Sequence, residues 1–193
     1  MSETYDMRAT GETIDLTAYG HELVRYARAH LREALVGEKA QRPSGTWCKQ
    51  PGATFVTLRW KHGGDLQGCI GTLEADRAIL DDVAYNAVAA GTRDPRTQPC
   101  TLADVDKLDV ELSILSPLEP IGSEADIRVG TDGIVLLHHG RRATFLPVMW
   151  ERLATKDVFM GELRRKAGLP REFQSSDIKL LRYTASKFED PAP

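Results

Sequence analysis

Apolar residues recur with a helical period in three segments of the chain. Between residues 15 and 36 they return every three or four positions, which is typical of an amphipathic helix, and Asp15 is placed to cap its start. The same period predicts helices at about 76–90 and 155–167. Each segment is followed by a glycine that can end a helix, in order Gly37, Gly91 and Gly168.

Alternating apolar and polar positions predict two hairpins and two further strands. Residues 53–61 and 66–70 are rich in β-branched and aromatic side chains, and the turn-forming sequence HGGD joins them. A second hairpin is expected over 133–146, with its turn at His139-Gly140. Single strands are expected at 107–115 and at 178–187.

The order hairpin, helix, strand occurs twice along the chain. A β-β-α-β unit used twice and a coincidence of common elements both explain this order, because no residue-level similarity relates the two halves. Strands separated by single helices predict an α+β fold in which helices pack on mixed or antiparallel sheets. The expected organisation is a flexible tail over 1–14, a single domain over 15–188 or two interlocked lobes of about 15–116 and 117–188, and a tail over 189–193.

Composition and charge argue against several classes of protein. With 193 residues, of which 41% are hydrophobic, the chain can bury a sizeable core. The net charge of −3, with both signs interspersed, argues against nucleic-acid binding. We recognise neither an apolar run long enough to span a membrane nor a signal peptide, so we expect a cytoplasmic protein. Its three widely spaced cysteines are expected to be reduced thiols: Cys48, Cys69 and Cys100.

One cysteine lies in a glycine-rich strand, in the stretch DLQGCIGT. Strand alternation predicts that Leu66, Gly68 and Ile70 share the core face, while Gln67, Cys69 and Gly71 point away from it. The glycines remove side chains beside the thiol, so a ligand or another backbone can approach closely. The predicted helix that follows would favour a thiolate near its start. The pattern therefore predicts either a reactive thiol at Cys69 or a small apolar filler.

Charged residues elsewhere supply candidate partners for that thiol. The loop sequence GTRDPRTQP contains Arg93, Asp94 and Arg96, which either hold a phosphate or carboxylate or simply brace the turn. On the next strand Glu111 is either an acid or base beside the hairpin or a solvated edge charge. The candidate ligand-binding residues around Cys69 are Gln67, Gly68, Gly71, Thr72, Arg93, Asp94, Arg96 and Glu111.

Several well-known site motifs are missing from the sequence. No pair of His or Cys residues has zinc-site spacing, and the closely spaced cysteine triplet of radical enzymes is absent. Neither GxGxxG, a P-loop nor GxSxG occurs. We therefore expect no metal and no cofactor.

Four blocks of the sequence resemble the AMMECR1 domain family in their order, spacing and residue types, over about residues 15–188. The family includes microbial members called AmmeMemoRadiSam system protein A. The blocks read FVTLRWKHGGDLQGCIGTL, NAVAAGTRDPR, LDVELSILSPLEPI and ATFLPVMWERLATKDVFMGELRRKAGL.

The resemblance implies a two-lobed α+β fold with a cleft lined by the family's LRGCIG motif, which falls here on residues 66–71. Gln67 stands where the family has arginine, so a cation that would hold a thiolate or an anion is lost at this position. The family's Asp-Pro-Arg element is intact at residues 94–96, its Leu-Pro element at 146–147 and its Lys-Ala-Gly-Leu element at 166–169, whereas Thr97 replaces an aromatic residue. No activity is established for the family, and the partners implied are a Memo-like protein and a radical SAM protein.

Two functions remain open at this point. In the first, Cys69 is the nucleophile of an enzyme or enzyme component, and Arg93 or Arg96 holds an anionic part of the substrate. In the second, the chain is a non-catalytic module that binds a protein or ligand in the cleft around the GCIG motif. A third, redox switching, would need Cys48 or Cys100 to resolve an oxidised Cys69.

Overall fold

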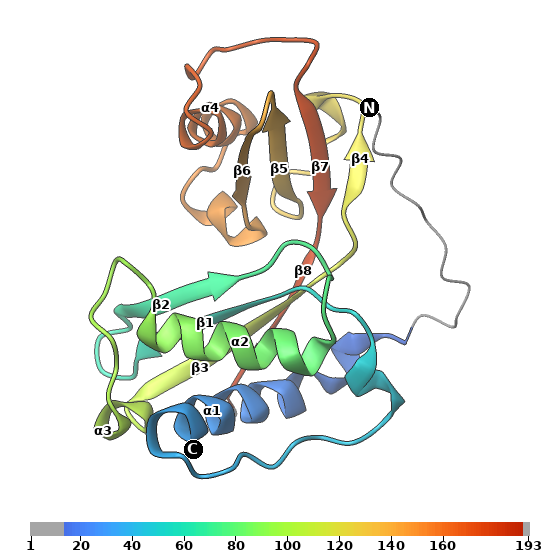
Figure 1. Cartoon of the computed structure of the whole chain (residues 1–193). Coiled ribbons are helices and arrows are strands. Elements are labelled where there is room, and N and C mark those ends of the chain that lie inside the picture. Colours follow the sequence, from blue (N-terminus) through green and yellow to red (C-terminus); the bar gives the residue numbers. More distant parts are fainter. Residues whose placement is uncertain (1–13, 191–193) are drawn as a thin grey trace.

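The computed structural model describes residues 14–190 and shows two lobes, each with a four-stranded antiparallel sheet (Figure 1). The predicted α+β fold is confirmed, and every strand pairing is antiparallel. Of the tails expected over 1–14 and 189–193, residues 1–13 and 191–193 lie outside the described residues. Within the described part of the chain, no helix has both the length and the apolar character needed to cross a membrane.

In the first lobe two helices cover one face of a sheet with strand order β2-β1-β3-β8 (Figure 1). The helices are α1 (Gly20–Val36) and α2 (Ile79–Thr92). The strands are β1 (Thr54–Trp60), β2 (Leu66–Gly71), β3 (Leu108–Leu115) and β8 (Ala185–Glu189). Shorter helices are η1 (Leu16–Tyr19), η2 (Thr46–Lys49) and α3 (Leu102–Val105).

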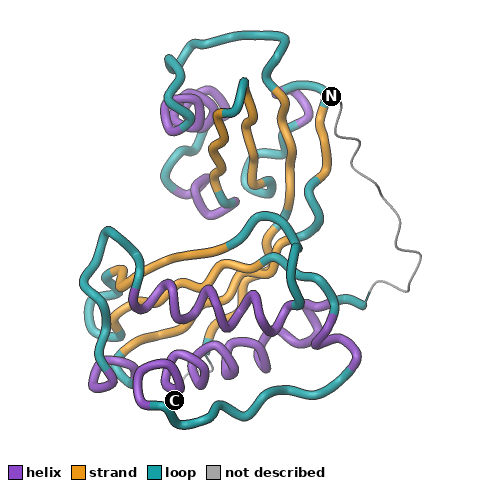
Figure 2. The backbone as a smooth tube through the Cα atoms, viewed as in Figure 1, coloured by secondary structure: helices purple, strands orange, loops and turns teal. Residues whose placement is uncertain are grey.

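In the second lobe one longer helix, α4 (Lys156–Lys166), packs on a sheet with strand order β4-β7-β5-β6. The strands are β4 (Glu119–Ile121), β5 (Gly133–His138), β6 (Arg141–Phe145) and β7 (Lys179–Tyr183). Two 3-10 turns, η3 (Glu124–Asp126) and η4 (Pro147–Glu151), complete the lobe. A long loop joins α4 to β7 (teal in Figure 2).

The predicted helix starts and stops fit two of the three helices. Asp15 caps the first helical turn through a bond from the Thr17 amide, and Gly37 ends α1 in the left-handed conformation. The stop predicted at Gly91 is wrong, because α2 continues through Thr92. A side chain at Gly91 would approach Leu31 and the Cys100 sulfur to 2.7 and 2.9 Å, so this glycine serves close packing.

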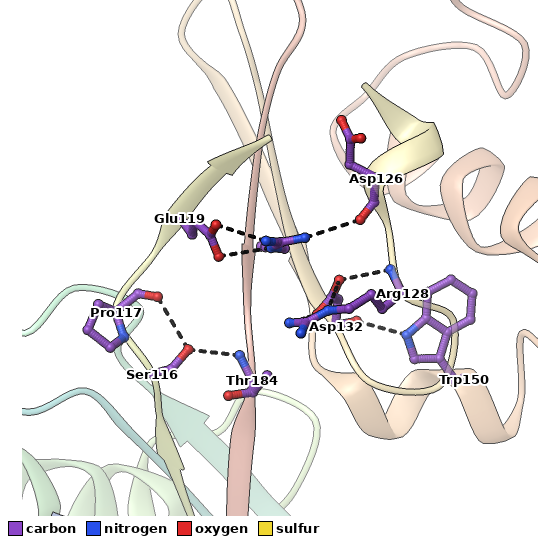
Figure 3. A network of polar contacts seen from close by, with 9 residues as sticks. Ser116, Pro117, Glu119, Asp126, Arg128, Asp132, Trp150 and Thr184 are labelled. Atoms are coloured by element: carbon purple, nitrogen blue, oxygen red, sulfur yellow. Dashed lines mark hydrogen bonds and ion pairs between the residues drawn. The ribbon is translucent and has the colours of Figure 1, made fainter. Parts of the chain in front are cut away.

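Two extended segments run side by side from one lobe to the other. The strand predicted over 178–187 is divided at Thr184. Residues 185–188, expected in the second lobe, and Glu189, expected in the C-terminal tail, pair with β3 in the first lobe. The Ser116 amide donates to the Thr184 carbonyl oxygen at 3.0 Å. The Thr184 amide donates to Ser116 Oγ at 2.9 Å (Figure 3). Each sheet therefore receives one edge strand from the other lobe's chain segment. β8 in the first sheet continues β7 of the second lobe, and β4 in the second sheet continues β3 of the first lobe.

Apolar packing joins the lobes as well as filling each of them. Each lobe has its own buried cluster under its helices, and a third cluster lies between the lobes. The buried members of this third cluster are Ala53, Leu115, Val135 and Tyr183. Glu74, after β2, also forms an ion pair of 2.6 Å with Arg142 on β6. The lobes are thus packed against one another rather than only tethered.

Candidate functional site

Cys69 lies in β2, at the edge of the first sheet, and it is partly exposed. Its cross-strand partner is Thr57 on β1, whose hydroxyl donates a hydrogen bond of 3.1 Å to the Cys69 sulfur. Cys48 and Cys100 are buried, and desolvation is the main cause that raises the pKa of both thiols. Among the three cysteines, Cys69 is therefore the one that a reagent reaches most easily.

The Asp-Pro-Arg loop binds the outer edge of β2 at Cys69. The Cys69 amide donates to Asp94 Oδ2 at 2.8 Å, and Arg96 donates to the Cys69 carbonyl oxygen at 3.1 Å. Arg96 also holds the Asp94 carboxylate through two bonds, at 2.6 and 2.9 Å. The two side chains thereby satisfy backbone groups that an edge strand would otherwise leave unpaired.

The charges of this loop stabilise each other strongly. Hydrogen bonds from Arg96 hold the pKa of Asp94 well below its usual range, although burial of the carboxyl opposes the shift. The Asp94 side chain is 1% exposed, whereas that of Arg96 is 58% exposed. The pKa of Arg96 is raised, chiefly by Asp94 and to a smaller extent by the Cys69 thiol. Arg96 therefore combines a fixed structural role with a solvent-facing positive charge beside the sulfur.

The two glycines of the motif make room for the protein itself. A side chain at Gly68 would lie 1.9 Å from the Ala90 carbonyl oxygen, so α2 crosses directly over this residue. A side chain at Gly71 would enter the ring of Phe55, its cross-strand partner. The expectation is that a ligand or another backbone approaches these glycines. The structure shows backbone at Gly68, and at Gly71 it shows the Phe55 side chain, which is not expected.

Gln67 departs from the predicted alternation because β2 contains a bulge. Leu58 pairs with Gly68 but the next residue, Arg59, pairs with Leu66, which leaves Gln67 as the extra residue. Gln67 is 5% exposed and donates to the Gln98 carbonyl oxygen at 2.6 Å. The Gln67 side chain therefore fastens β2 to the loop that follows Arg96.

Three other candidate residues lie in separate environments. Thr72 contacts Asp82 and accepts a bond of 3.1 Å from Asn86 in a buried polar network beneath the hairpin. Arg93 stacks on the Tyr85 ring, with 4.6 Å between guanidinium carbon and ring centre. Glu111 lies on β3 opposite Thr57, so that β1 separates it from Cys69 on β2. It forms ion pairs with Arg59 at 3.1 Å and with Lys187 at 3.2 Å.

Lys166 is a further cation near Cys69, from the other lobe. Its ammonium donates to the Thr144 carbonyl oxygen at 2.9 Å and lies 5.1 Å from the centre of the Phe145 ring. Partial burial lowers its pKa and repulsion from Arg96 adds to that shift, while the Cys69 thiol opposes it. The sequence showed this lysine only as part of the Lys-Ala-Gly-Leu block, and no local pattern connects it with the cysteine.

Comparison with known proteins assigns the chain to a family. The family model described as AMMECR1 matches residues 24–188. The chain belongs to the AMMECR1 family. A relative from Methanothermobacter thermautotrophicus is 35% identical over 182 residues, which cover 89% of this chain and 94% of that protein. Protein MJ0810 of Methanocaldococcus jannaschii is 32% identical and is covered over 89% of its length.

A solved structure shares the fold of this AMMECR1 family member. The crystal structure of the uncharacterized protein PH0010 from Pyrococcus horikoshii matches with a TM-score of 0.81 and 29% sequence identity. The match covers 89% of this chain and 91% of that one. These relatives support the family and the fold, and their names state no activity.

The chemistry available at the junction of the AMMECR1 lobes is that of a thiol flanked by cations. Arg96 comes from the first lobe and Lys166 from the second, and both interact electrostatically with Cys69. Among the described residues no group of three or more His, Cys, Asp and Glu side chains is placed to hold a metal.

Proposed function

We propose that Cys69 is the nucleophile of a covalent site at the junction of the two lobes. The observation that supports it is the contrast between one partly exposed thiol beside two cations and two buried thiols. Arg96 and Lys166 suit the proposed substrate, a small compound with an electrophilic carbonyl carbon and an anionic group. Arg93, the other candidate for holding this anion, stacks on Tyr85 instead.

The proposed reaction is transfer of an acyl group through the cysteine. The sulfur forms a bond to the carbonyl carbon, and the bond from that carbon to the leaving group breaks. Lys166 takes the thiol proton and returns it to the leaving group, because partial burial lowers its pKa and so leaves more of it in the neutral, proton-accepting form than in an ordinary lysine. Attack by water or a second acceptor then releases the acyl group and restores the thiol.

Alkylation kinetics test the reactivity of the thiol. Iodoacetamide and iodoacetate are applied at neutral pH to the full chain, and peptide mass analysis follows each cysteine separately. Cys69 should react at least about tenfold faster than Cys48 and Cys100, because it is partly exposed while burial shields the other two thiols and raises their pKa. Lys166→Gln should slow the anionic reagent more than the neutral one, while Lys39→Gln, a change at an exposed lysine elsewhere, should not. Equal, slow labelling of all three cysteines would rule out the nucleophile.

A second candidate function is a non-catalytic binding module, and the packing around the motif favours it. Protein atoms fill the space beside Gly68 and Gly71, and Asp94 and Arg96 are occupied with the backbone of Cys69. In this case the lobe junction would dock the Memo-like or radical SAM partner implied by the family association. Cys69→Ser separates the two candidates in a binding assay with these two proteins and in an assay of their joint activity. A module keeps both binding and activity, whereas a nucleophile keeps binding and loses activity.

A further inference from the structure

A cavity of about 650 Å³ lies in the second lobe, away from Cys69. It is formed where the turn between β5 and β6 meets the segment that leads into β7 (Figure 1). Its volume is within the range of small-molecule sites. The residues that contribute its polar and charged groups are His138, His139, Arg141, Arg142, Ser176, Asp177 and Lys179.

Three permanent cations and one carboxylate line this cavity. Arg142 and Lys179 lie in one row of the sheet, because both are cross-strand partners of Leu137. Arg141 lies one position closer to the turn, opposite His138. The lining is therefore basic in a chain whose net charge is −3, which favours an anionic ligand.

The arginines are each anchored by one nitrogen, which leaves other donors free. Arg141 Nη1 donates to the Gly168 carbonyl oxygen at 2.5 Å, next to the end of α4. Arg142 Nη1 contacts Glu74 of the first lobe at 2.6 Å. A guanidinium has five N–H donors, so each arginine is held in place and can still bind a ligand. Lys179 forms no ion pair with any residue in the described part of the chain.

The turn adds a histidine at a position that usually holds another residue. His139 has φ +44° and Gly140 has φ +78°, as in the two-residue hairpin turns that favour asparagine and glycine. His139 is the only non-glycine residue with positive φ in the described part of the chain. Its ring bonds Asp177 across the cavity at 3.2 Å, which ties the turn to the segment before β7.

We propose that this cavity binds a small molecule through a phosphoryl group. A phosphoryl group offers several acceptor oxygens in different directions, which suits donors that come from two strands and from Ser176. Among residues 14–190 Lys179 has no ion-pair partner, and Arg142, on the same face of the sheet, supplies a forked donor beside it. The site is separate from Cys69 and does not depend on the proposed nucleophile.

Calorimetric titration of the full chain with pyrophosphate tests the site, in buffer that contains no other phosphate. Pyrophosphate should bind the unchanged chain and Cys69→Ser equally well. Lys179→Gln should weaken binding about tenfold, because it removes the unpaired cation. The matched change Lys39→Gln, at an exposed lysine outside the cavity, should leave affinity unchanged.

A second variant guards against effects on folding. His139→Asn keeps a residue that tolerates positive φ and removes the imidazole, so it should weaken pyrophosphate binding and leave the melting temperature unchanged. No binding of pyrophosphate, or equal binding by the unchanged chain and Lys179→Gln, would overturn the proposal. Citrate provides a carboxylate comparison, and binding of citrate as tight as that of pyrophosphate would overturn the phosphoryl assignment.

Discussion

The two lobes have the same strand order but differ in what lies on the sheet face away from the helices. Read from the edge, the orders are β2-β1-β3-β8 and β6-β5-β7-β4, and the unit β-β-α-β is present in each. The central row reads Cys69, Thr57 and Glu111 in the first lobe and Thr144, Val135 and Leu181 in the second. One topology therefore presents polar groups in one lobe and apolar packing in the other.

The edge strands β2 and β6 are nevertheless alike in one respect, because a basic side chain binds a backbone carbonyl oxygen of each. In the first lobe Arg96 donates to the carbonyl oxygen of Cys69, and in the second Lys166 donates to that of Thr144. Each cation comes from the segment at or after the end of its own lobe's helix. Only the first lobe adds a carboxylate, Asp94, on the amide of the same residue. The comparison indicates that a basic clamp on the edge strand is shared, while the thiol belongs to one lobe.

The largest expected effect comes from filling the contact between β2 and α2. Gly68→Ala places a methyl group 1.9 Å from the Ala90 carbonyl oxygen, and backbone cannot move aside cheaply. We expect a loss of about 3 kcal/mol or more in the free energy of unfolding, measured by urea denaturation. Gly122→Ala is the control, because its new methyl group would meet only Asp126 at 3.5 Å, an ordinary contact. Similar stabilities for the two variants would contradict the packing described for β2.

Exchanging the central residues of the two rows, Thr57 and Val135, should have a smaller effect on stability. Only the change from valine to threonine should destabilise the protein. Val135→Thr buries a hydroxyl in the cluster between the lobes and should cost about 2 kcal/mol of unfolding free energy. Thr57→Val should change stability by less than about 0.5 kcal/mol, because the residue is only partly buried. It should slow alkylation of Cys69 about threefold, because the hydroxyl bond to the sulfur is lost. Equal losses of stability in Val135→Thr and Thr57→Val would contradict the difference described between the sheet faces of the two lobes.

A smaller loss of stability than that of Val135→Thr is expected at Asp94, the carboxylate that binds the edge strand of the first lobe. Asp94→Asn should lower the free energy of unfolding by about 1 kcal/mol at pH 7, because a charge-assisted bond to Arg96 is weakened. The folded state lowers the pKa of Asp94, so its contribution is complete above the ordinary aspartate range and is lost as the pH falls below about 4. Urea denaturation at pH 7 and at lower pH measures the gap between the two proteins. A gap that grows on acidification would contradict this assignment.

Periodicity predicted the long elements well, and local exceptions explain where it did not. The first helix and both hairpins are found because their apolar positions repeat over many residues. The bulge leaves Gln67 buried although it was expected to point away from the core, and nothing in the residue types marks the bulge. Gly91 has the residue type of a helix stop, but the contact with Leu31 that needs a glycine there comes from another helix. Tertiary contacts decide each of these positions.

The candidate site was only partly accessible to sequence reasoning. The Asp-Pro-Arg loop and the cysteine strand were both singled out, and the structure places Asp94 and Arg96 on the backbone of Cys69. Arg93 and Thr72 belong to the same stretches of sequence but lie in other contacts. Lys166 comes from the other lobe, and no spacing along the chain predicts its electrostatic interaction with Cys69. Proximity to the cysteine in sequence was therefore a poor predictor of which side chains lie near its sulfur.

The pairing of β8 with β3 also constrains the order in which the two lobes can fold during translation. Ala185 pairs with Leu115, and Asp190 bonds Arg28 of α1, so the first lobe waits for residues made after the entire second lobe. Pairings this distant along the chain slow folding, since a long loop must close before they form. A nascent chain whose Tyr183 has just left the ribosome can complete the second lobe while the first lobe still lacks β8.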